Sequence, residues 1–375
     1  MKNVLIVTGQ HFATSPRKVD LHFIADVLTQ EGAHVDFLSL RLSWISRLSQ
    51  DGRFNFARQR RMNRWTAVSA GVDEYIWYSP FHLMNLRNPV LNRVSGGLFR
   101  LLGSHLPAAV RKRLSDYTDI LIESGQGPLM TAEIRALAPR ARIIYHAADR
   151  LSTIGSHPAI QKVLERTIGD YDLVHIMAEA LRSDIPSGPP VVYLPHGISK
   201  QAFDTAQNPY ARGRNVVSVG DMLFDAHAVA VLAASFPDWT FHLFGKKAML
   251  EKPPANVITH GEVPFEQVVG YIKFADIGLA PYLESGDADY LSQSSLKMIQ
   301  YTYCRLPIIA PSFAAAGRDH VHAYMPTDDD SLRAAFKRAK AYDRDSIDAG
   351  AALSWQEKTD ALFSTGAGRR DVTGI

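Results

Sequence analysis

The sequence predicts an α/β protein of two domains, each built around a parallel sheet. Short β-type runs alternate with segments long enough for a helix, as expected for βαβ units. The length of 375 residues exceeds what one ordinary core fills and suits two domains. The pattern breaks at Pro195-His196-Gly197 and resumes after Arg214, so we place the domain boundary at Gly197.

The first half, residues 1–197, begins with the strand Val4–Thr8 and a helix from Arg17 to Glu31, which Gly32 ends. Its other strands are predicted at His34–Leu38, Tyr75–Tyr78, Ile120–Glu123, Arg142–His146, Leu173–Met177 and Val191–Leu194. In open α/β sheets ligands bind beyond the carboxyl ends of the strands, so the loops after these runs are candidate sites.

The second half, residues 198–345, repeats the alternation. Its strands are predicted at Val216–Val219, Thr240–Phe244, Asn256–Thr259, Ile277–Ala280 and Ile308–Ala310. Its helices are predicted at Ala226–Ser235, Phe265–Phe274 and Ser294–Tyr303. Residues 346–375 are expected to form a segment that crosses back to the first domain.

The composition is that of a globular protein outside the membrane, with 46% hydrophobic and 21% charged residues. No apolar run reaches the roughly 18 residues that span a bilayer, and the N-terminus lacks the pattern of a signal peptide. Cys304 is the only cysteine, which excludes an intramolecular disulfide and favours a reducing compartment. We therefore expect a cytoplasmic protein.

The positive charge is concentrated near the N-terminus, where residues 1–113 hold 16 Lys and Arg against 7 Asp and Glu. Between Arg41 and Arg64, seven arginines face one acidic residue, and apolar side chains are interleaved with them. This mixture is typical of a segment on an anionic membrane surface. A nucleic-acid contact and a solvated loop whose aromatics pack on the domain are alternatives. We expect this segment to bind the membrane surface, with Trp44, Arg58, Arg61 and Trp65 as contacts. We expect no nucleic-acid partner.

Two glycine turns in the second half could bind a ligand. Gly220 follows a strand and could present backbone N–H groups to an anion, or could serve turn geometry alone. The surrounding residues do not form a full G-x-G-x-x-G pattern, so a dinucleotide fingerprint is not supported. His260-Gly261-Glu262-Val263 could hold a nucleobase edge, or could be a helix entry where Glu262 meets the positive helix end.

The segment from Ala280 to Tyr301 carries the strongest local signal. Tyr282 follows a strand, and Ser294-Ser295 open a helix whose N-terminus favours a pyrophosphate. Lys297 and Gln300 are three residues apart and share a face of that helix. The alternatives are plain capping by Ser294 and a solvent-facing Lys297. The acidic loop before the helix shows no defined ligand spacing, so no metal site is expected.

Asp149 follows the strand Arg142–His146 and could accept a proton from an acceptor hydroxyl. The alternative is that Asp149 caps the next helix. His11 and His22 could line the same cleft as Asp149, or could be structural or surface residues.

Blocks spread over both halves resemble one known family. They include Pro16-Arg17, Glu123-Ser124-Gly125, Ala148-Asp149 with Leu151-Ser152-Thr153-Ile154, His196-Gly197, Met222-Leu223-Phe224-Asp225, Gly261-Glu262, Ala280-Pro281-Tyr282, and Ser294-Ser295 with Lys297 and Gln300-Tyr301. In their order and spacing the chain resembles glycosyltransferase family 70, the GumK-like glucuronosyltransferases, over nearly its whole length.

The resemblance implies a GT-B fold, with two Rossmann-like domains facing a cleft. It implies that residues 1–197 bind the acceptor, residues 198–345 bind the nucleotide-sugar, and Asp149 is the catalytic base. The donor contacts it implies are Met222, Glu262, Val263, Tyr282, Leu296, Lys297 and Gln300, to which we add Ser294 and Ser295. On the acceptor side we expect His11.

The implied reaction moves glucuronate from UDP-glucuronate to a mannose of a polyprenyl-diphosphate-linked oligosaccharide, with inversion and without a cofactor. The place of reaction is then the inner membrane surface. Alternatives are another nucleotide-sugar donor, a UDP-sugar epimerase and a non-catalytic scaffold. The chain departs from the family pattern at Arg150, Asp221 and the loop Gly245-Lys246-Lys247-Ala248.

Overall fold

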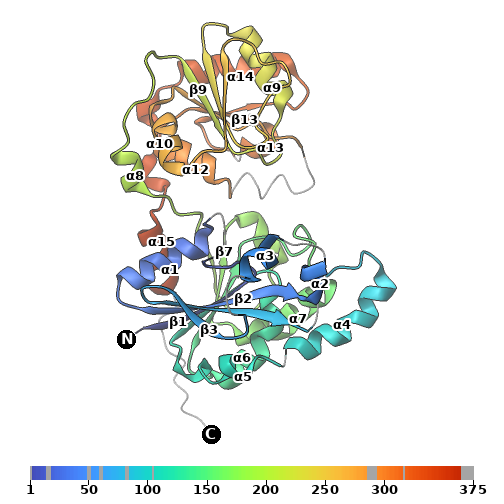
Figure 1. The fold of residues 1–375 in the computed structure, drawn as a ribbon. Helices are drawn as coiled ribbons and strands as arrows, with labels where there is room; N and C mark the ends of the chain where they lie inside the picture. Colours follow the sequence, from blue (N-terminus) through green and yellow to red (C-terminus); the bar gives the residue numbers. More distant parts are fainter. Residues whose placement is uncertain are drawn as a thin grey trace. The chain divides into compact units, whose positions relative to one another are not determined.

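A computed structural model describes residues 2–13, 18–48, 52–58, 62–80, 84–103, 105–284, 294–315 and 317–364. The chain divides into two compact units, Met1–Leu194 with Lys358–Ile375, and Pro195–Glu357 (Figure 1). The division falls three residues before the predicted boundary at Gly197. Residues 346–357, which we expected in a separate crossing segment, belong to the second unit.

The first unit is built on an eight-stranded sheet in the order β3-β4-β2-β1-β5-β6-β7-β8. All neighbours in this sheet are parallel except the β3–β4 hairpin. The strands are β1 Asn3–Thr8, β2 His34–Ser43, β3 Trp65–Ser69, β4 Val72–Ser79, β5 Asp119–Glu123, β6 Arg142–Ala147, β7 Leu173–Ile176 and β8 Val191–Tyr193.

Helices cover this sheet and connect its parallel strands. They are α1 Asp20–Gln30, α2 Trp44–Leu48, α3 Gly52–Arg58, α4 Pro89–Gly103, α5 Ala108–Arg111, α6 Thr131–Leu137 and α7 Pro158–Thr167, with 3-10 turns at Leu114–Asp116, Gly127–Met130, Ile168–Asp170 and Glu179–Asp184. The core side chains of α1 pack on alternate residues of β1 and β2, which is why the helix follows a period of three to four residues and the strands a period of two.

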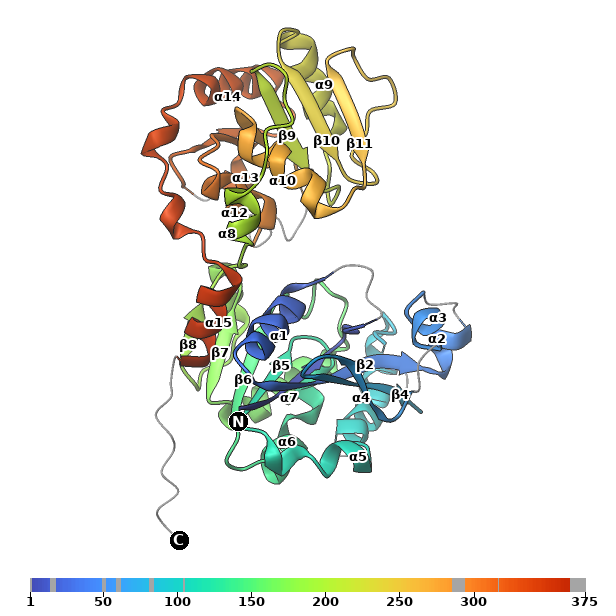
Figure 2. The ribbon, with the colours of Figure 1, turned by 60° about the vertical axis from the view of Figure 1, so that its left-hand side comes forward.

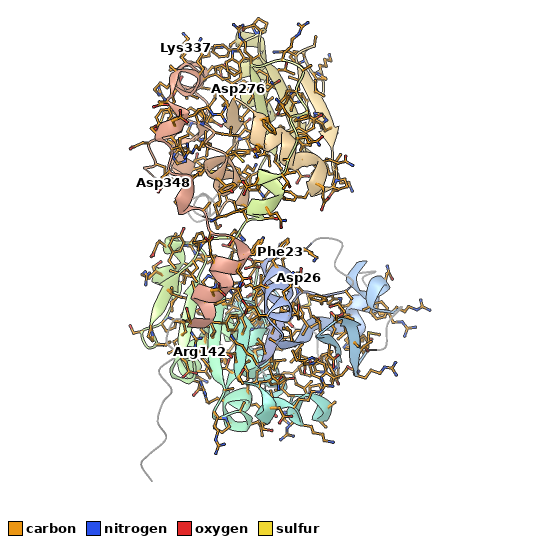
Figure 3. The ribbon with its side chains drawn as sticks, turned by 90° about the vertical axis from the view of Figure 1, so that its left-hand side faces the viewer. Phe23, Asp26, Arg142, Asp276, Lys337 and Asp348 are labelled. Carbon is orange, nitrogen blue, oxygen red and sulfur yellow. The ribbon has the colours of Figure 1, made fainter. Side chains whose placement is uncertain are left out.

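The last helix, α15 Trp355–Ser364, returns to the first unit. Leu362 packs in the same core as α1, and the Arg142 guanidinium donates to the carbonyl oxygens of Leu362 and Phe363 at 3.2 and 2.8 Å (Figure 3). Lys358 is fully buried, with its Nζ 3.7 Å from Asp20 Oδ2, and burial lowers the pKa of Lys358 to about 8. The buried pair of Lys358 and Asp20 therefore fixes the position of α15 in the first unit.

The second unit is a six-stranded parallel sheet in the order β11-β10-β9-β12-β13-β14 (Figure 2). Its strands are β9 Asn215–Val219, β10 Thr240–Phe244, β11 Val257–Gly261, β12 Ile277–Leu279, β13 Ile308–Pro311 and β14 Val321–Tyr324. Its helices are α8 Lys200–Asp204, α9 Ala226–Ser235, α10 Phe265–Phe274, α12 Leu296–Tyr303, α13 Ser312–Ala315 and α14 Asp329–Ala341, with 3-10 turns at Arg344–Ser346 and Ala349–Ala351.

Both faces of the central strands of this second sheet are buried, as their continuous apolar sequences require. Val217 and Ile308 pack in a core with α10 and α12, while their neighbours Val216 and Ile309 pack in the opposite core with α9 and α14. Close approach of α12 to the sheet depends on Gly278, because a Cβ there would lie 2.4 Å from the Tyr301 ring.

Candidate functional site

The predicted donor residues gather at one edge of the second sheet. Because all its strands are parallel, their carboxyl ends meet at the same edge. Gly220 follows β9, the Gly245 loop follows β10, Glu262 follows β11 and Tyr282 follows β12. Gly220 has a φ of 84°, so here the glycine is required by the turn itself.

Backbone contacts hold the loop after Gly220 against the loop after β12. Phe224 and Tyr282 form an antiparallel bridge, and Leu283 N–H donates to the Leu223 carbonyl at 2.7 Å. Leu223 adopts a left-handed φ of 53°, and the preceding Met222 is 59% exposed. Met222 is therefore presented at this edge rather than packed in the core.

Lys297 lies over Tyr282 at the centre of this edge. Its Nζ is 4.6 Å from the centroid of the Tyr282 ring, and a Cβ on Gly220 would lie 3.8 Å from the same atom. Burial lowers the pKa of Lys297 to about 8, against the opposing effect of Asp221. Lys297 is half-buried and is not the solvent-facing lysine of the alternative interpretation. An anion bound here would restore the full charge of this ammonium group.

The start of α12 has no side-chain cap among the residues that the structure describes. Ser295 occupies the N-cap position, but its hydroxyl is bonded to the Tyr282 hydroxyl at 2.6 Å. Ser294 is half-buried before it, and Leu296 is 39% exposed. Since the first N–H groups of a helix need partners, this uncapped end beside Lys297 suits a diphosphate.

The remaining donor predictions differ in their surroundings. Glu262 is exposed after Gly261, which has a φ of 72°, and Val263 is half-buried against the core. Gln300 is buried, with 6% of its surface exposed, so it lies deeper than Lys297 on their common helix face.

An aromatic stack that the sequence did not single out lies beside Glu262. The rings of Phe244 and His260 are parallel, with centroids 4.2 Å apart, and Tyr271 lies 4.9 Å from His260. Burial lowers the pKa of His260. No motif links these three residues in the sequence, because they come from two strands and a helix.

Two of the departures from the family pattern contact each other. The Asp221 carboxylate accepts a hydrogen bond from Lys247 N–H at 2.9 Å. Asp221 therefore fixes the loop that carries Lys246 and Lys247, and the two departures form one structural unit. The third departure, Arg150, is paired with Asp184 at 2.8 Å in the first unit.

Asp149 lies at the carboxyl edge of the first sheet, directly after β6. Its side chain is exposed, and its N–H donates to Ser124 Oγ at 3.2 Å, so the ends of β5 and β6 together set its position. It does not cap the following helix, because α7 begins at Pro158 and its cap is His157, which accepts from Ala159 N–H at 3.1 Å. An exposed carboxylate on this edge has the placement of a general base.

A buried polar network, formed by strands of the first sheet and the start of α1, lies beneath Asp149. His146 Nε2 is 3.0 Å from Asp20 Oδ2, and His146 Nδ1 is 2.7 Å from His175 Nδ1. Burial lowers the pKa of His175 well below its usual value and raises that of Glu123, which accepts from Gly9 N–H at 3.1 Å. Connected buried polar groups make the base of this edge rigid.

The predicted membrane contacts of the basic segment are not all at the surface. Trp44 is 51% exposed and Arg58 is exposed, whereas Arg61 lies outside the described residues. Trp65 packs in β3 and donates from Nε1 to the Ala109 carbonyl at 3.1 Å. His11, expected on the acceptor side, is 2% exposed.

The aromatic residues of this segment largely follow the alternative interpretation. Phe54 is buried in a cluster with Leu42 and Ile76, and Met62 packs against it. For Phe54 and Trp65 the packed alternative is therefore correct, because each ring has a partner in the first unit.

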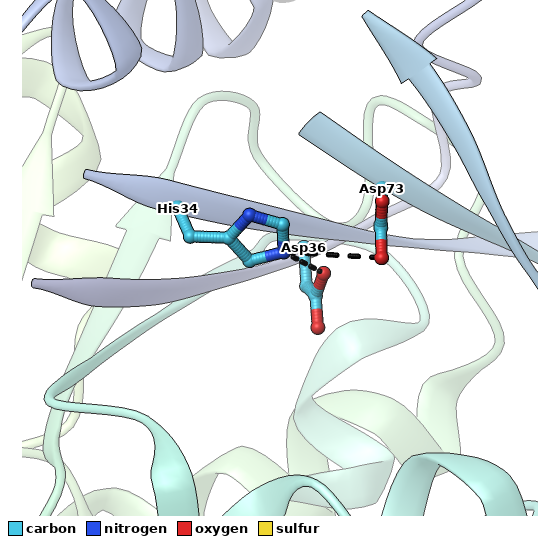
Figure 4. Close-up of side chains that lie close together, drawn as sticks. All are labelled: His34, Asp36 and Asp73. Atoms are coloured by element: carbon cyan, nitrogen blue, oxygen red, sulfur yellow. Dashed lines mark hydrogen bonds and ion pairs between the residues drawn. The ribbon is translucent and has the colours of Figure 1, made fainter. Parts of the chain in front are cut away.

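Three potential metal ligands lie together at the opposite end of the first sheet (Figure 4). His34, Asp36 and Asp73 offer atoms within 4.8 Å of one another. A cation already lies there, since Arg113 Nη1 is 2.9 Å from Asp36 and 3.1 Å from Asp73. Tyr117 OH also donates to Asp36 at 2.5 Å. We interpret the cluster as a structural ion-pair network.

We expect Arg113→Met to lower the free energy of unfolding by about 2 kcal/mol, because Asp36 would be left buried without its cation. Arg182→Met is the control, since it removes only a surface pair with Glu179 and should cost under about 1 kcal/mol. Urea denaturation measures both. Equal stability of the two variants would contradict this interpretation of Arg113.

Comparisons with known proteins agree with this architecture. The sequence profile described as Glucuronosyltransferase GumK, N-terminal domain, matches residues 6–177. A UDP-glucuronate:glycolipid 2-beta-glucuronosyltransferase from Xanthomonas campestris pv. campestris is 32% identical over 362 residues, which cover 96% of this chain and 88% of the relative.

Solved structures with the same fold include the trehalose-6-phosphate synthase OtsA, with a TM-score of 0.59 and 13% identity over 97% of this chain and 96% of that chain. A UDP-forming trehalose-phosphate synthase from Burkholderia xenovorans has a TM-score of 0.59 and 11% identity, over 98% of this chain and 100% of that chain. At these identities the likeness concerns the fold alone, and it confirms the GT-B class predicted from the sequence. Since the match covers 96% of this chain and 88% of the relative, the chain belongs to the GumK family of glucuronosyltransferases.

Proposed function

We propose that this protein transfers glucuronate from UDP-glucuronate to a mannose hydroxyl of a polyprenyl-diphosphate-linked oligosaccharide, with inversion at the anomeric carbon. The observation that carries the proposal is the position of Lys297 over Tyr282, between the Gly220 turn and the uncapped start of α12. These groups suit the diphosphate of a nucleotide-sugar. The choice of UDP-glucuronate is supported by the name of the Xanthomonas relative.

The proposed reaction is a single displacement. The acceptor oxygen attacks the anomeric carbon, the bond from this carbon to the diphosphate oxygen breaks, and the hydroxyl proton passes to Asp149. Lys297 and the first N–H groups of α12 offset the charge that grows on the departing diphosphate. Since these groups already supply positive charge, we propose that no metal or cofactor takes part.

Donor choice is tested by offering UDP-glucuronate, UDP-glucose and GDP-mannose separately, each with membranes that contain lipid-linked acceptors. We expect UDP release that depends on both UDP-glucuronate and the acceptor. Faster turnover of UDP-glucose or GDP-mannose would assign the protein a different donor. Turnover of a UDP-sugar without acceptor would instead indicate an epimerase.

We propose that the protein reaches its acceptor as a peripheral protein on the cytoplasmic face of the inner membrane. Among the described residues, no helix is both long and apolar enough to cross a bilayer. Exposed apolar side chains gather on α4, in addition to Trp44 and Leu48 of the basic segment: Val90, Leu91, Val94 and Leu98 are 68%, 52%, 75% and 44% exposed. An exposed apolar helix face beside arginines suits the membrane interface.

The α4 face gives a direct test of membrane docking. We expect Val94→Asp with Leu98→Asp to reduce co-flotation with anionic phospholipid vesicles about tenfold, because both charges would enter the acyl boundary. Met325→Asp, an exposed apolar position in the second unit, is the control and should float normally. Unchanged flotation of the α4 variant would contradict the assignment.

A further inference from the structure

A basic pocket of about 750 Å³ lies between α4 and α7 in the first unit. Arg87 and Arg93 line it from the side of α4, and Lys162 and Arg166 line it from α7. None of its lining residues is acidic, and none of the four cations has an ion pair in the described part of the chain. Four unneutralised cations around one hollow favour an anion of high charge.

Side-chain contacts hold the two helices together around this pocket. Ser95 Oγ is 3.1 Å from His157 Nε2, and the Phe99 ring meets the His157 ring edge-on at 4.5 Å. Gly96 lies opposite Ala159 in this contact, where a Cβ on Gly96 would lie 3.4 Å from the Ala159 Cβ. The positions of the cations are therefore set by packed helices rather than by a loop alone.

The helix α4 has two opposite faces with different chemistry. Arg93 and Gly96 face the pocket, whereas Val90, Val94 and Leu98 recur every four residues on the exposed face. A ligand that combines an anionic group with a long hydrocarbon chain matches both faces. The anion would enter the pocket while the chain stays in the bilayer beside α4.

The pocket belongs to the same end of the sheet as Asp149. The connection from β6 carries Asp149 and leads directly into α7, whose N-terminal residues line the pocket. Asn85 Nδ2 also donates to the Ser156 carbonyl at 3.3 Å, which ties the segment before Arg87 to this connection. With an acceptor sugar bound at Asp149, the anionic linkage of the acceptor would therefore point toward the pocket.

We propose that this pocket binds the diphosphate of the lipid-linked acceptor, with Arg87, Arg93, Lys162 and Arg166 as its ligands. The inference rests on the proposed function for the identity of the acceptor. The guanidinium groups of Arg87 and Arg93 can each hold a phosphate through two N–H donors, and Lys162 and Arg166 balance the remaining charge. The pocket thereby selects acceptors with a diphosphate linkage and holds the lipid end of the substrate.

The test is equilibrium binding of farnesyl diphosphate to the full chain by calorimetry, without any sugar donor. We expect Lys162→Gln with Arg166→Gln to weaken binding about tenfold or more, and Arg93→Gln to weaken it to a similar degree. The control, Lys112→Gln with Arg140→Gln, removes two exposed cations of the same unit that lie outside the pocket and should bind as the native protein does. Because all substitutions are on exposed side chains, thermal unfolding should be unchanged.

Two results would overturn the proposal. The first is equal binding of farnesyl diphosphate to the native protein and the pocket variants; if these variants also no longer float with anionic vesicles, the pocket is assigned to phospholipid headgroups instead. The second is an equal loss in the control variant, which would indicate general attraction to positive charge. Since no transfer is measured, a wrong sugar donor would leave this test unaffected.

Discussion

Asp149→Asn is expected to slow glucuronosyl transfer by about 10³-fold, the range that a positioned general base contributes. The amide keeps the shape of the side chain but cannot accept the hydroxyl proton. The backbone hydrogen bond to Ser124 does not involve the altered atoms, so the local fold should persist. UDP binding depends on the second unit and should stay within about twofold of the native value.

Initial rates with saturating donor, together with calorimetric UDP binding, measure this effect. Asp26→Asn is the matched control, because it removes a carboxylate from the surface of α1, where the one ion pair of Asp26 among the described residues is with exposed Lys18 (Figure 3). The control should retain native rates. An Asp149→Asn enzyme within a few-fold of the native rate would remove Asp149 from the role of base.

Lys297→Met should lower kcat/KM for the donor about 100-fold, through lost binding of the diphosphate and lost stabilisation of its developing charge. The flexible apolar side chain of methionine can still cover Tyr282, so packing changes little. Donor titrations measure the loss, and acceptor affinity serves as the internal control. A native kcat/KM in this variant would show that Lys297 does not contact the donor.

The pH dependence of kcat/KM for the donor shows whether Lys297 acts through its charge or through its packing. Burial lowers the pKa of Lys297 to about 8, so in the free enzyme the ammonium form is present below that pH and is lost above it. Since kcat/KM reports the free enzyme, it should fall as the pH rises through about 8. Lys297→Arg keeps its charge and should abolish this fall up to about pH 10. A fall that persists in Lys297→Arg would assign it to another group.

Much of the second unit could be predicted from the sequence. The helices Ala226–Ser235 and Phe265–Phe274 have the predicted bounds, and the former begins after Asp225, whose carboxylate accepts from His227 N–H at 3.0 Å. Strong apolar runs bounded by caps and glycines carry this information locally. The helix α14 and strand β14 were not predicted, although Asp328 caps α14 in the same way.

The first unit was harder to predict where pairing or packing decides the structure. The strand β3 was not predicted, and its Trp65 was expected at the membrane, because the hairpin partner β4 and the packing of Trp65 are not local features. The helix α4 was missed, since Gly96 and Gly97 interrupt its pattern like a loop. Gly96 lies against Ala159 of α7, a contact that only the tertiary structure reveals.

In the site, too, short motifs predicted the positions of single residues, whereas contacts between residues distant in the sequence could not be predicted. The position of Asp149 after a strand and of Lys297 one turn into a helix could be predicted, because both follow from short motifs. The contact between Asp221 and Lys247, and the stack of Phe244 on His260, join different strand ends. Such contacts depend on the register of the sheet, which a single sequence does not specify.

The most direct test of the account follows a labelled sugar from the donor to the lipid. The purified protein is incubated with UDP-glucuronate labelled in the sugar and with membranes that contain lipid-linked oligosaccharide, and the label in the lipid extract is counted. We expect label to enter the lipid fraction with the native protein, almost none to enter with Asp149→Asn, and little to enter from equally labelled UDP-glucose. Label that enters from UDP-glucose instead, or equally with Asp149→Asn, would contradict this expectation.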